Sequence, residues 1–375
     1  MNTPVSADST KEPLLEGTEV EHYQIGRRLA AGGMGVVHEG RDKKTGERVA
    51  IKFLHPEIAK HREVTLRFIN EARAVTIIGH PNLVRIIHLG RQEGGAPYLV
   101  MEYLDGIPLH VRVRESGGRL PLFQAIDVCH QVAEALTASH EKGIVHRDLK
   151  PENIMLLANP QGGTQVKVFD FGIAKLPAEH MSKEFTMLRT QSGQLLGTPH
   201  YMAPEQCRSD RKVSDKTDVY ALASVLFRCL AGRTPFVTEA RGDAALMHIC
   251  AQQIAEPAPA LSQFVPDAPA ALVALVKQAL SKEPDERPTM KEFSQHLSRT
   301  MNAPAGADET KNLATRLLGK GNDPTTPFRR DQAPTVTSEM KAQSHRRGSS
   351  RPVLYVAAGI FALVWLIVLS LWALA

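Results

Sequence analysis

A change of hydrophobic pattern near residue 105 constrains the fold of this sequence more than any other feature. Before it, short apolar or alternating runs are separated by Gly, Asp and Lys, as in strands joined by turns. These runs cover residues 23–30, 35–42, 47–54 and 98–104. One helical segment interrupts them at 64–78, where Phe68, Ala72 and Val75 recur at helical spacing. After residue 105 the periodicity is helical, so we expect an α+β protein with a β-rich lobe, a helical lobe and a cleft between them.

Two helices are expected in the second part of the chain. Residues 123–143 carry an inward face, formed by Ile126, Cys129, Ala133, Leu136 and His140. Gly143 is a suitable stop for that helix. Residues 214–232 are apolar nearly all round, which is typical of a helix buried in the centre of a lobe.

Composition excludes several classes of protein. The chain has 375 residues, of which 43% are hydrophobic, enough for a substantial core. The net charge of +5 is concentrated in residues 301–351, with nine Lys/Arg against five Asp/Glu, so a nucleic-acid partner is not indicated. The four cysteines contain no C-x-x-C pair, which argues against a zinc site or a disulfide framework and favours reduced core thiols.

The two ends of the chain differ in character. Residues 1–21 form a polar tail without a secretory signal, and 22–300 form one globular unit, with its lobes at 22–104 and 105–300. Residues 301–352, rich in Pro, Thr and charge, are expected to be a disordered basic linker. Residues 353–375 contain no charge, and as a helix they would rise about 34 Å, against a bilayer core of about 30 Å.

This C-terminal segment predicts a single-pass protein anchored in the inner (plasma) membrane. The basic flank at 345–351 places residues 1–351 in the cytoplasm. The chain ends three residues after Trp372, which predicts no domain outside the membrane unless the sequence is truncated. Small residues from Ala357 to Gly359 would allow a homodimer.

The stretch LAAGGMGVV, residues 29–37, has two interpretations. It is either a phosphate-binding glycine loop, with Gly32 and Gly35 as the second and third glycines, or an ordinary glycine-rich hairpin turn. In the first case Ala30 stands where such a loop has its first glycine. The stretch alone does not decide between them.

Three further sites carry charge among apolar neighbours. Lys52, in VAIKFL, needs an anionic partner if it is buried, and Glu71 on the helix at 64–78 would face the same lobe; alternatively, Lys52 lies on an edge strand and faces solvent. In residues 144–157, Asp148 and Asn153 are placed to point into one cleft, as a base and a metal ligand. Asp170, at the end of an apolar strand, is either a Mg²⁺ ligand or an aspartate that caps its own turn.

Taken in order, these motifs resemble the bacterial, membrane-anchored members of the Hanks-type serine/threonine protein kinase family. The resemblance covers about Tyr23 to Leu297 and rests on the glycine loop, VAIK, HRDLKPEN, DFG and APE. It implies the bilobal kinase fold and transfer of the γ-phosphate of ATP to Ser or Thr hydroxyls rather than to tyrosine. It also implies Mg²⁺, with Mn²⁺ as an alternative, and protein substrates.

The resemblance assigns a role to each matching residue. Asp148 would orient and deprotonate the substrate hydroxyl, and Lys150 would neutralise the transferred phosphoryl group. Asn153 and Asp170 would bind the metal. The ATP site would comprise Leu29, Ala30, Gly32, Gly33, Gly35, Val37, Ala50, Lys52, Glu71, Met101, Glu102, Leu104 and Met155. Met101 resembles the gatekeeper but is nearly as compatible with plain core.

The same resemblance predicts regulation by autophosphorylation. Thr190, Ser192 and Thr198 lie between DFG and APE, and Arg147 would pair with a phosphate there. Asp218 resembles the aspartate that braces the catalytic loop, and Arg287 resembles the partner of Glu205. Ala223 occupies a position where the family usually has glycine, so some packing adjustment is expected.

Three competing functions remain to be weighed. A membrane-tethered pseudokinase scaffold predicts loss of Lys52, Asp148, Asn153 or Asp170, and all four are present. A small-molecule phosphotransferase would lack HRDLKPEN followed by a long Ser/Thr-bearing segment and APE. A membrane anchor with an incidental soluble domain does not account for the density of motifs.

Overall fold

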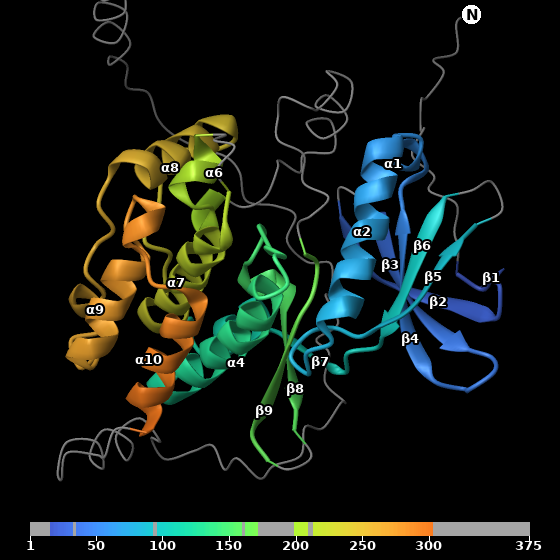
Figure 1. Ribbon diagram of the computed structural model, residues 1–375, viewed down its shortest axis with the longest axis horizontal. Coiled ribbons are helices and arrows are strands. Elements are labelled where there is room, and N and C mark those ends of the chain that lie inside the picture. Colours follow the sequence, from blue (N-terminus) through green and yellow to red (C-terminus); the bar gives the residue numbers. More distant parts are fainter. Residues whose placement is uncertain are drawn as a thin grey trace, which may run out of the picture. The chain divides into compact units, whose positions relative to one another are not determined.

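A six-stranded antiparallel sheet forms the first part of the protein, in the strand order β1-β2-β3-β4-β6-β5 (Figure 1). The computed structural model describes residues 16–32, 35–92, 96–159, 162–171, 199–208 and 213–302. The strands of this sheet are β1 (Glu19–Val20), β2 (Tyr23–Gly32), β3 (Gly35–Asp42), β4 (Arg48–Leu54), β5 (Ile86–Arg91) and β6 (Pro97–Glu102). Apolar side chains alternate along the strands, so one face of the sheet buries a core around Ile51, Phe53 and Tyr98.

The two helices of this lobe are α1 (Pro56–Ala59) and α2 (Arg62–Ile78). Helix α2 packs Phe68 and Ala72 against Leu54 and Leu99 of the sheet, as its 3.6-residue periodicity predicts. It ends at Gly79, whose φ of 61° is the left-handed conformation that glycine adopts most readily.

A second, three-stranded antiparallel sheet follows the first lobe. Its strands are β7 (Gly106–Pro108), β8 (Ile154–Ala158) and β9 (Thr164–Val168), in that order. An isolated parallel bridge pairs Leu83, which follows α2, with Val168 at the end of β9. The segment after α2 is thereby attached to the strand that leads to Asp170.

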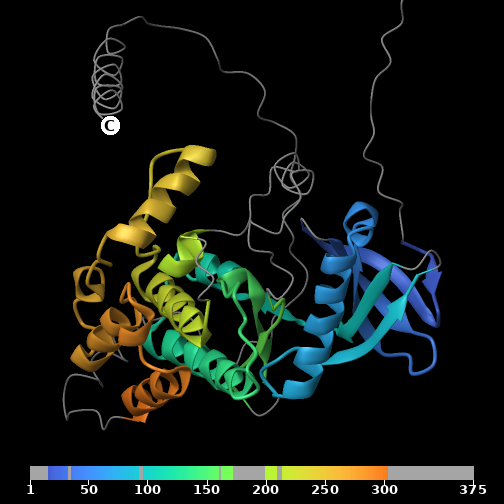
Figure 2. The same ribbon diagram turned by 45° about the horizontal axis from the view of Figure 1, so that its top comes forward.

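Helices make up most of the second lobe (Figure 2). They are α3 (Leu109–Glu115), α4 (Leu122–His140), α6 (Pro204–Cys207), α7 (Asp215–Ala231), α8 (Asp243–Ala255), α9 (Ala270–Ala279) and α10 (Met290–Asn302). Short 3₁₀ turns are η1 (Pro151–Asn153), η4 (Pro199–Tyr201), η5 (Leu261–Gln263) and η6 (Pro284–Glu286). Helix α7 is buried almost along its whole length, with α4, α9 and α10 packed around it. Ala223 on α7 is fully buried, so its methyl group is part of this core.

The predicted β-rich and helical lobes are confirmed, and the expected helices at 123–143 and 214–232 correspond to α4 and α7. Gly143 follows the end of α4 by three residues and has a φ of 72°. The sequence interpretation missed β5, a strand that His88 interrupts and that is mostly half-buried. It also missed β1, which lies inside the segment interpreted as a polar tail.

The C-terminal predictions fall on residues that the structure does not describe. Contacts divide the chain into two units, 1–317 and 318–375, and every described residue lies in the first. Within the described ranges, no helix combines the length and the apolar character needed to cross a bilayer. The linker at 301–352 beyond Asn302 and the segment 353–375 lie outside these ranges.

Candidate active site

The carboxylate of Asp218 on α7 anchors the loop that carries Asp148. The backbone N–H groups of His146 and Arg147 donate to its two oxygens at 2.8 and 2.9 Å. Burial acts to raise the pKa of Asp218, but hydrogen bonding and the charge of His140, at 2.8 Å, outweigh it and hold that pKa below its ordinary value. Arg147 adopts a φ of 66°, which costs a non-glycine residue energy and persists because these bonds fix it. The predicted brace is confirmed.

His146 links the catalytic loop to the segment that bears Asp170. Its Nδ1 accepts from the backbone N–H of Asp148 at 3.3 Å, and its Nε2 donates to the carbonyl of Phe169 at 3.2 Å. The ring also packs on Phe171, with centroids 4.6 Å apart. Burial lowers the pKa of His146, so the neutral ring that these two bonds require is favoured.

Asp148, Lys150 and Asn153 converge as the sequence predicts. Lys150 Nζ lies 3.1 Å from Asp148 Oδ2, and Asn153 Nδ2 donates to the Asp148 carbonyl at 2.8 Å. The 3₁₀ turn that begins at Pro151 brings Asn153 back toward Asp148. Because Asn153 uses its amide nitrogen here, its amide oxygen is the atom that would bind a metal.

Lys52 on β4 forms an ion pair with Asp170. The Lys52 side chain is 13% exposed and that of Asp170 is 47% exposed, so the lysine is sheltered, as the anion-partner interpretation requires. Desolvation acts to raise the pKa of Asp170, and the Lys52 ammonium outweighs it and lowers that pKa. The edge-strand alternative is wrong, because β4 pairs with both β3 and β6.

Asp170 occupies a fixed position at the end of β9. Val168 donates its N–H to the Asn82 carbonyl at 2.8 Å and accepts from Val84 N–H at 3.0 Å. Two residues later Asp170 has a φ of 59°, a left-handed conformation that turns the chain and its carboxylate out of the strand. The preceding residue, Phe169, donates its N–H to the Asn153 carbonyl at 3.1 Å, so the segments that carry the Asp170 carboxylate and the Asn153 amide are joined, and such oxygen donors suit Mg²⁺. The residues present therefore fit a metal-bound nucleotide.

The glycine stretch forms the β2–β3 hairpin, with Gly32 opposite Gly35. A Cβ at Gly35 would lie 1.9 Å from the carbonyl oxygen of Phe53, so this glycine is needed for the close approach of β3 to β4. At Gly32 the nearest atom to such a Cβ is 4.0 Å away, so the fold itself leaves room for a side chain. Ala30 is exposed on β2 opposite Val37, and Leu29 is 36% exposed. Packing therefore requires glycine at residue 35 but not at residue 32.

Three predicted adenine contacts lie on two sheets. Ala50 on β4 is buried and faces Met101 on β6 across the ladder. Met101 is half-buried and packs against both the helical-lobe core and the α2 cluster, so the core interpretation is confirmed and the gatekeeper role stays a prediction. Met155 on β8 is half-buried.

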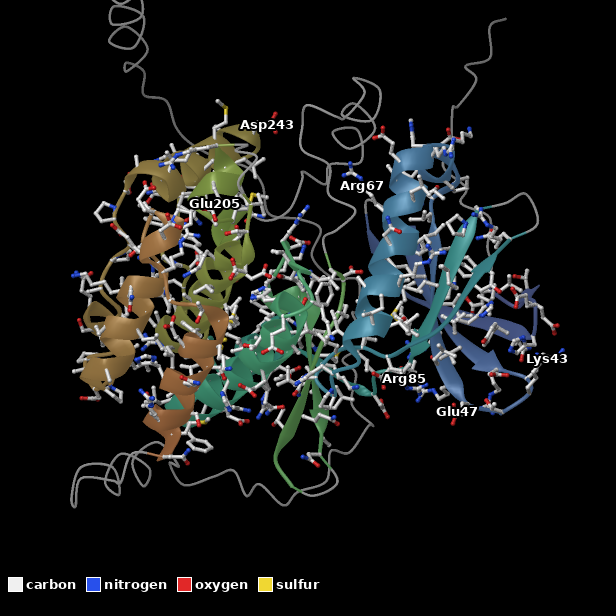
Figure 3. The ribbon with its side chains drawn as sticks, viewed as in Figure 1. Lys43, Glu47, Arg67, Arg85, Glu205 and Asp243 are labelled. Carbon is white, nitrogen blue, oxygen red and sulfur yellow. The ribbon has the colours of Figure 1, made fainter. Side chains whose placement is uncertain are left out.

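The connection after β6 is locked by the side chain of Glu102. Its Oε1 accepts from Arg85 N–H at 2.7 Å and from Lys167 Nζ at 2.7 Å (Arg85 is labelled in Figure 3). The backbone N–H of Glu102 donates to the Arg85 carbonyl at 3.0 Å, so this group is not available to adenine. The Leu104 carbonyl accepts from Gly106 N–H at 3.1 Å, and the role of Leu104 in adenine binding stays a prediction.

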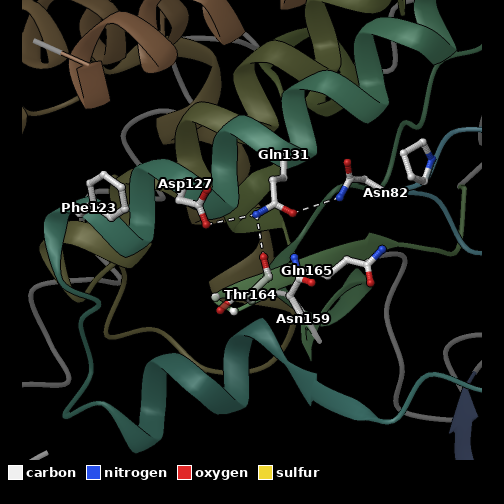
Figure 4. A pocket seen from close by; sticks show the side chains of 10 residues that line it. Asn82, Phe123, Asp127, Gln131, Asn159, Thr164 and Gln165 are labelled. Carbon is white, nitrogen blue, oxygen red and sulfur yellow. Dashed lines mark hydrogen bonds between the residues drawn. The ribbon is translucent and has the colours of Figure 1, made fainter. Parts of the chain in front are cut away.

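A hollow of about 710 Å³ beside the β8–β9 turn contains a polar network centred on Gln131 of α4 (Figure 4). Gln131 Oε1 accepts from Asn82 at 3.1 Å and from Val166 N–H at 2.9 Å, while its Nε2 donates to Asp127 at 3.1 Å and to the Thr164 carbonyl at 2.9 Å. Helix α4, β9 and the segment after α2 are thus joined by one side chain. The network fixes the strand that presents Asp170.

A buried ion pair lies inside the helical lobe. Arg287 donates to the two carboxylate oxygens of Glu205 at 2.8 and 2.9 Å, as predicted (Glu205 is labelled in Figure 3). Gln206, the next residue on α6, donates to the Arg147 carbonyl at 2.8 Å. The residue that follows the APE motif is therefore in direct contact with the catalytic loop.

Some predicted residues lie outside the described part of the structure. These are Gly33, the side chain of Glu71, and Thr190, Ser192 and Thr198. Sequence reasoning assigned no role to Gln131, His146, Lys167 or Gln206 and took His140 for a core residue. A polar residue on the inward face of an otherwise apolar helix, as with Gln131 and His140 on α4, was the available signal.

This arrangement defines a two-lobed phosphotransferase site, and comparison with known proteins agrees. Residues 23–297 match the protein kinase domain family. The chain belongs to the protein kinase family.

Several bacterial proteins are similar to this chain. The chain is 42% identical over 277 residues to serine/threonine-protein kinase Pkn1 of Myxococcus xanthus, covering 74% of this chain and 38% of that one. It is 37% identical over 270 residues to serine/threonine-protein kinase PknB of Mycobacterium tuberculosis, covering 71% and 41%. The crystal structure of the Mycobacterium tuberculosis PknI kinase domain superimposes with a TM-score of 0.57 at 25% identity, covering 76% of this chain and 99% of that one. The chain thus spans about two fifths of the length of the Pkn1 and PknB proteins.

Proposed function

We propose that this protein is a serine/threonine protein kinase that transfers the γ-phosphate of ATP to hydroxyl groups of protein substrates. The observation that carries the proposal is that three segments meet. Lys52 pairs with Asp170, one loop holds Asp148, Lys150 and Asn153 together, and the backbone N–H of Phe169 donates to the Asn153 carbonyl at 3.1 Å, which joins that loop to the segment bearing Asp170. The similar bacterial proteins named serine/threonine-protein kinases support it.

Each of these residues has its own role in phosphoryl transfer. Asp148 accepts the proton of the substrate hydroxyl, and Lys150, 3.1 Å from it, places a positive charge where the phosphoryl group passes. Lys52 holds the α and β phosphates. Asn153 and Asp170 would hold Mg²⁺, which neutralises charge on the phosphates when bound. Because little covalent chemistry is required, rate depends on how rigidly Asp218 and His146 hold these groups.

The experiment compares the purified full-length chain with Asp148→Asn. With labelled ATP and Mg²⁺, wild type should phosphorylate itself or a generic basic protein, and the variant should be slower by about 10²–10⁴-fold. An unchanged melting temperature would show that the variant is folded. Absence of transfer by wild type, with nucleotide binding retained, would favour the scaffold function.

Activation by autophosphorylation is part of the proposal. Arg147 is exposed beside Asp148, where its guanidinium can bind a phosphate. We propose Thr190 and Ser192 as acceptors, with Thr198 belonging to the same segment. Full activity of a Thr190→Ala, Ser192→Ala double variant, together with unmodified residues in mass spectra of active enzyme, would remove this part.

Tethering to the inner membrane through residues 353–375 is proposed from the charge-free run alone. The kinase domain would then face the cytoplasm. Full-length protein should stay in the membrane fraction after carbonate washing, and a chain without 353–375 should not. Recovery of both in the soluble fraction would reject the anchor.

A further inference from the structure

Two cysteines that the active site does not use lie side by side in the helical lobe. Cys207 ends α6 and Cys250 lies on α8, and these two helices pack against each other. The two thiols interact with each other across the interface between these helices. Both residues are partly exposed, whereas Cys129 and Cys229 are fully buried.

The surroundings of the pair favour a reactive thiolate. Hydrogen bonding to Cys207 lowers the pKa of Cys250 to about 7, while the same bond and burial raise the pKa of Cys207. The Lys282 ammonium lies near Cys207 and donates to the Gln253 carbonyl at the end of α8 at 2.7 Å. A thiolate beside a second thiol and a cation is the setting in which reversible oxidation occurs.

The pair is mechanically connected to the active site. Gln206, directly before Cys207, holds the Arg147 carbonyl at 2.8 Å, next to Asp148. One turn after Cys250, Gln253 donates to the carbonyls of Pro199 and His200, both at 3.1 Å. A disulfide requires the sulfur atoms to approach to about 2.05 Å and the two Cα atoms to lie about 4.4–6.8 Å apart, so its formation can shift α6 relative to α8.

We propose that Cys207 and Cys250 form a reversible disulfide that draws α6 toward α8, displaces Gln206 from Arg147 and slows phosphoryl transfer. Its effect on rate depends on the proposed kinase function, but the formation of the bond does not.

The reaction that forms the disulfide takes a hydroperoxide as oxidant. The Cys250 thiolate attacks one oxygen of H₂O₂, the O–O bond breaks, and hydroxide leaves as water. Cys207 then attacks the resulting sulfenic acid, and the S–O bond breaks with loss of a second water.

The first test is a mass measurement on the full-length chain. Protein reduced, treated with H₂O₂, alkylated after unfolding and digested should yield one cross-linked peptide pair joining Cys207 to Cys250, two hydrogens lighter than the separate peptides. Cys129 and Cys229 should remain alkylated as internal controls. Sulfinic acid at Cys250 without a cross-link, or a cross-link between two chains, would overturn the proposal, and neither result depends on kinase activity.

The second test is the phosphorylation rate of the same samples. Oxidation should lower the wild-type rate by about ten- to a hundredfold, as a displacement near 1 Å does, and dithiothreitol should restore it. Cys207→Ser and Cys250→Ser should keep the reduced wild-type rate and lose the response to peroxide. A cross-linked protein with an unchanged rate would refute the regulatory role. A reduced protein with no activity would instead reject the proposed function, while the mass result would still stand.

Discussion

The guanidinium of Arg287 and the carboxylate of Glu205 form a two-bond ion pair whose side chains are 0% and 4% exposed. Removing one partner leaves the other charged and buried, which is more costly than losing both. We expect Arg287→Ala to lower the free energy of unfolding by about 3–5 kcal/mol. Urea denaturation at pH 7.5 measures this.

The matched control is Arg287→Lys, which keeps the charge and loses the fork geometry. Arg287→Lys should lower the free energy of unfolding by less than Arg287→Ala does. A loss below about 1 kcal/mol for the alanine variant, the value of an exposed pair, would contradict the buried-pair interpretation.

Stability should fall as the pH is lowered. Burial lowers the pKa of His146, so its contribution is complete above the unfolded value of 6.5 and is lost as pH falls through the folded pKa. At Glu205 burial acts to raise the pKa, but Arg287 outweighs it, so this contribution is lost only below 4.5. Urea midpoints from pH 7.5 to about 3 should therefore decline in two stages. His146→Asn should flatten the first stage, and a wild-type midpoint independent of pH between 7 and 5 would count against the buried neutral histidine.

The sequence predicted the parts of the site that follow from local pattern and left out the parts that depend on three-dimensional packing. Asp148, Asn153 and Lys150 converge because one short loop and one 3₁₀ turn carry them. In contrast, Gln131 bonds to Val166, 35 residues away, and Lys167 bonds to Glu102, 65 residues away. No periodicity encodes such pairings. β5 was missed because a half-buried strand interrupted by a polar residue lacks a clear alternation.

The two hairpin glycines should respond differently to the same substitution. Gly35→Ala would place a methyl group 1.9 Å from the Phe53 carbonyl and should cost about 1–3 kcal/mol of stability. Gly32→Ala has 4.0 Å of clearance and should leave stability unchanged while raising the KM for ATP. Melting temperatures and steady-state kinetics on both variants separate packing from nucleotide binding. Equal destabilisation would show that the two positions are not distinguished by their contacts.

Ala30 provides a third position in the same hairpin. Its side chain is exposed on β2, so an Ala30→Gly change removes no packing contact. We expect the KM for ATP to change by no more than about threefold, the scale of an Ala-to-Gly difference in backbone entropy. A change of several orders of magnitude would mean that the loop meets the nucleotide in another register.

The ion pair between Lys52 and Asp170 offers the sharpest test of the nucleotide site. Lys52→Met removes the ammonium that holds the pKa of Asp170 down, and with it the charge that the phosphates would meet. We expect kcat/KM to fall by about 10²–10³-fold, the effect of losing one preorganised charge, with the melting temperature nearly unchanged. Lys52→Arg keeps the charge in a larger group and should retain more activity. If Lys52→Met stays within threefold of wild type in a phosphorylation assay, the lysine's role is confined to its contact with Asp170, and the nucleotide must be held elsewhere.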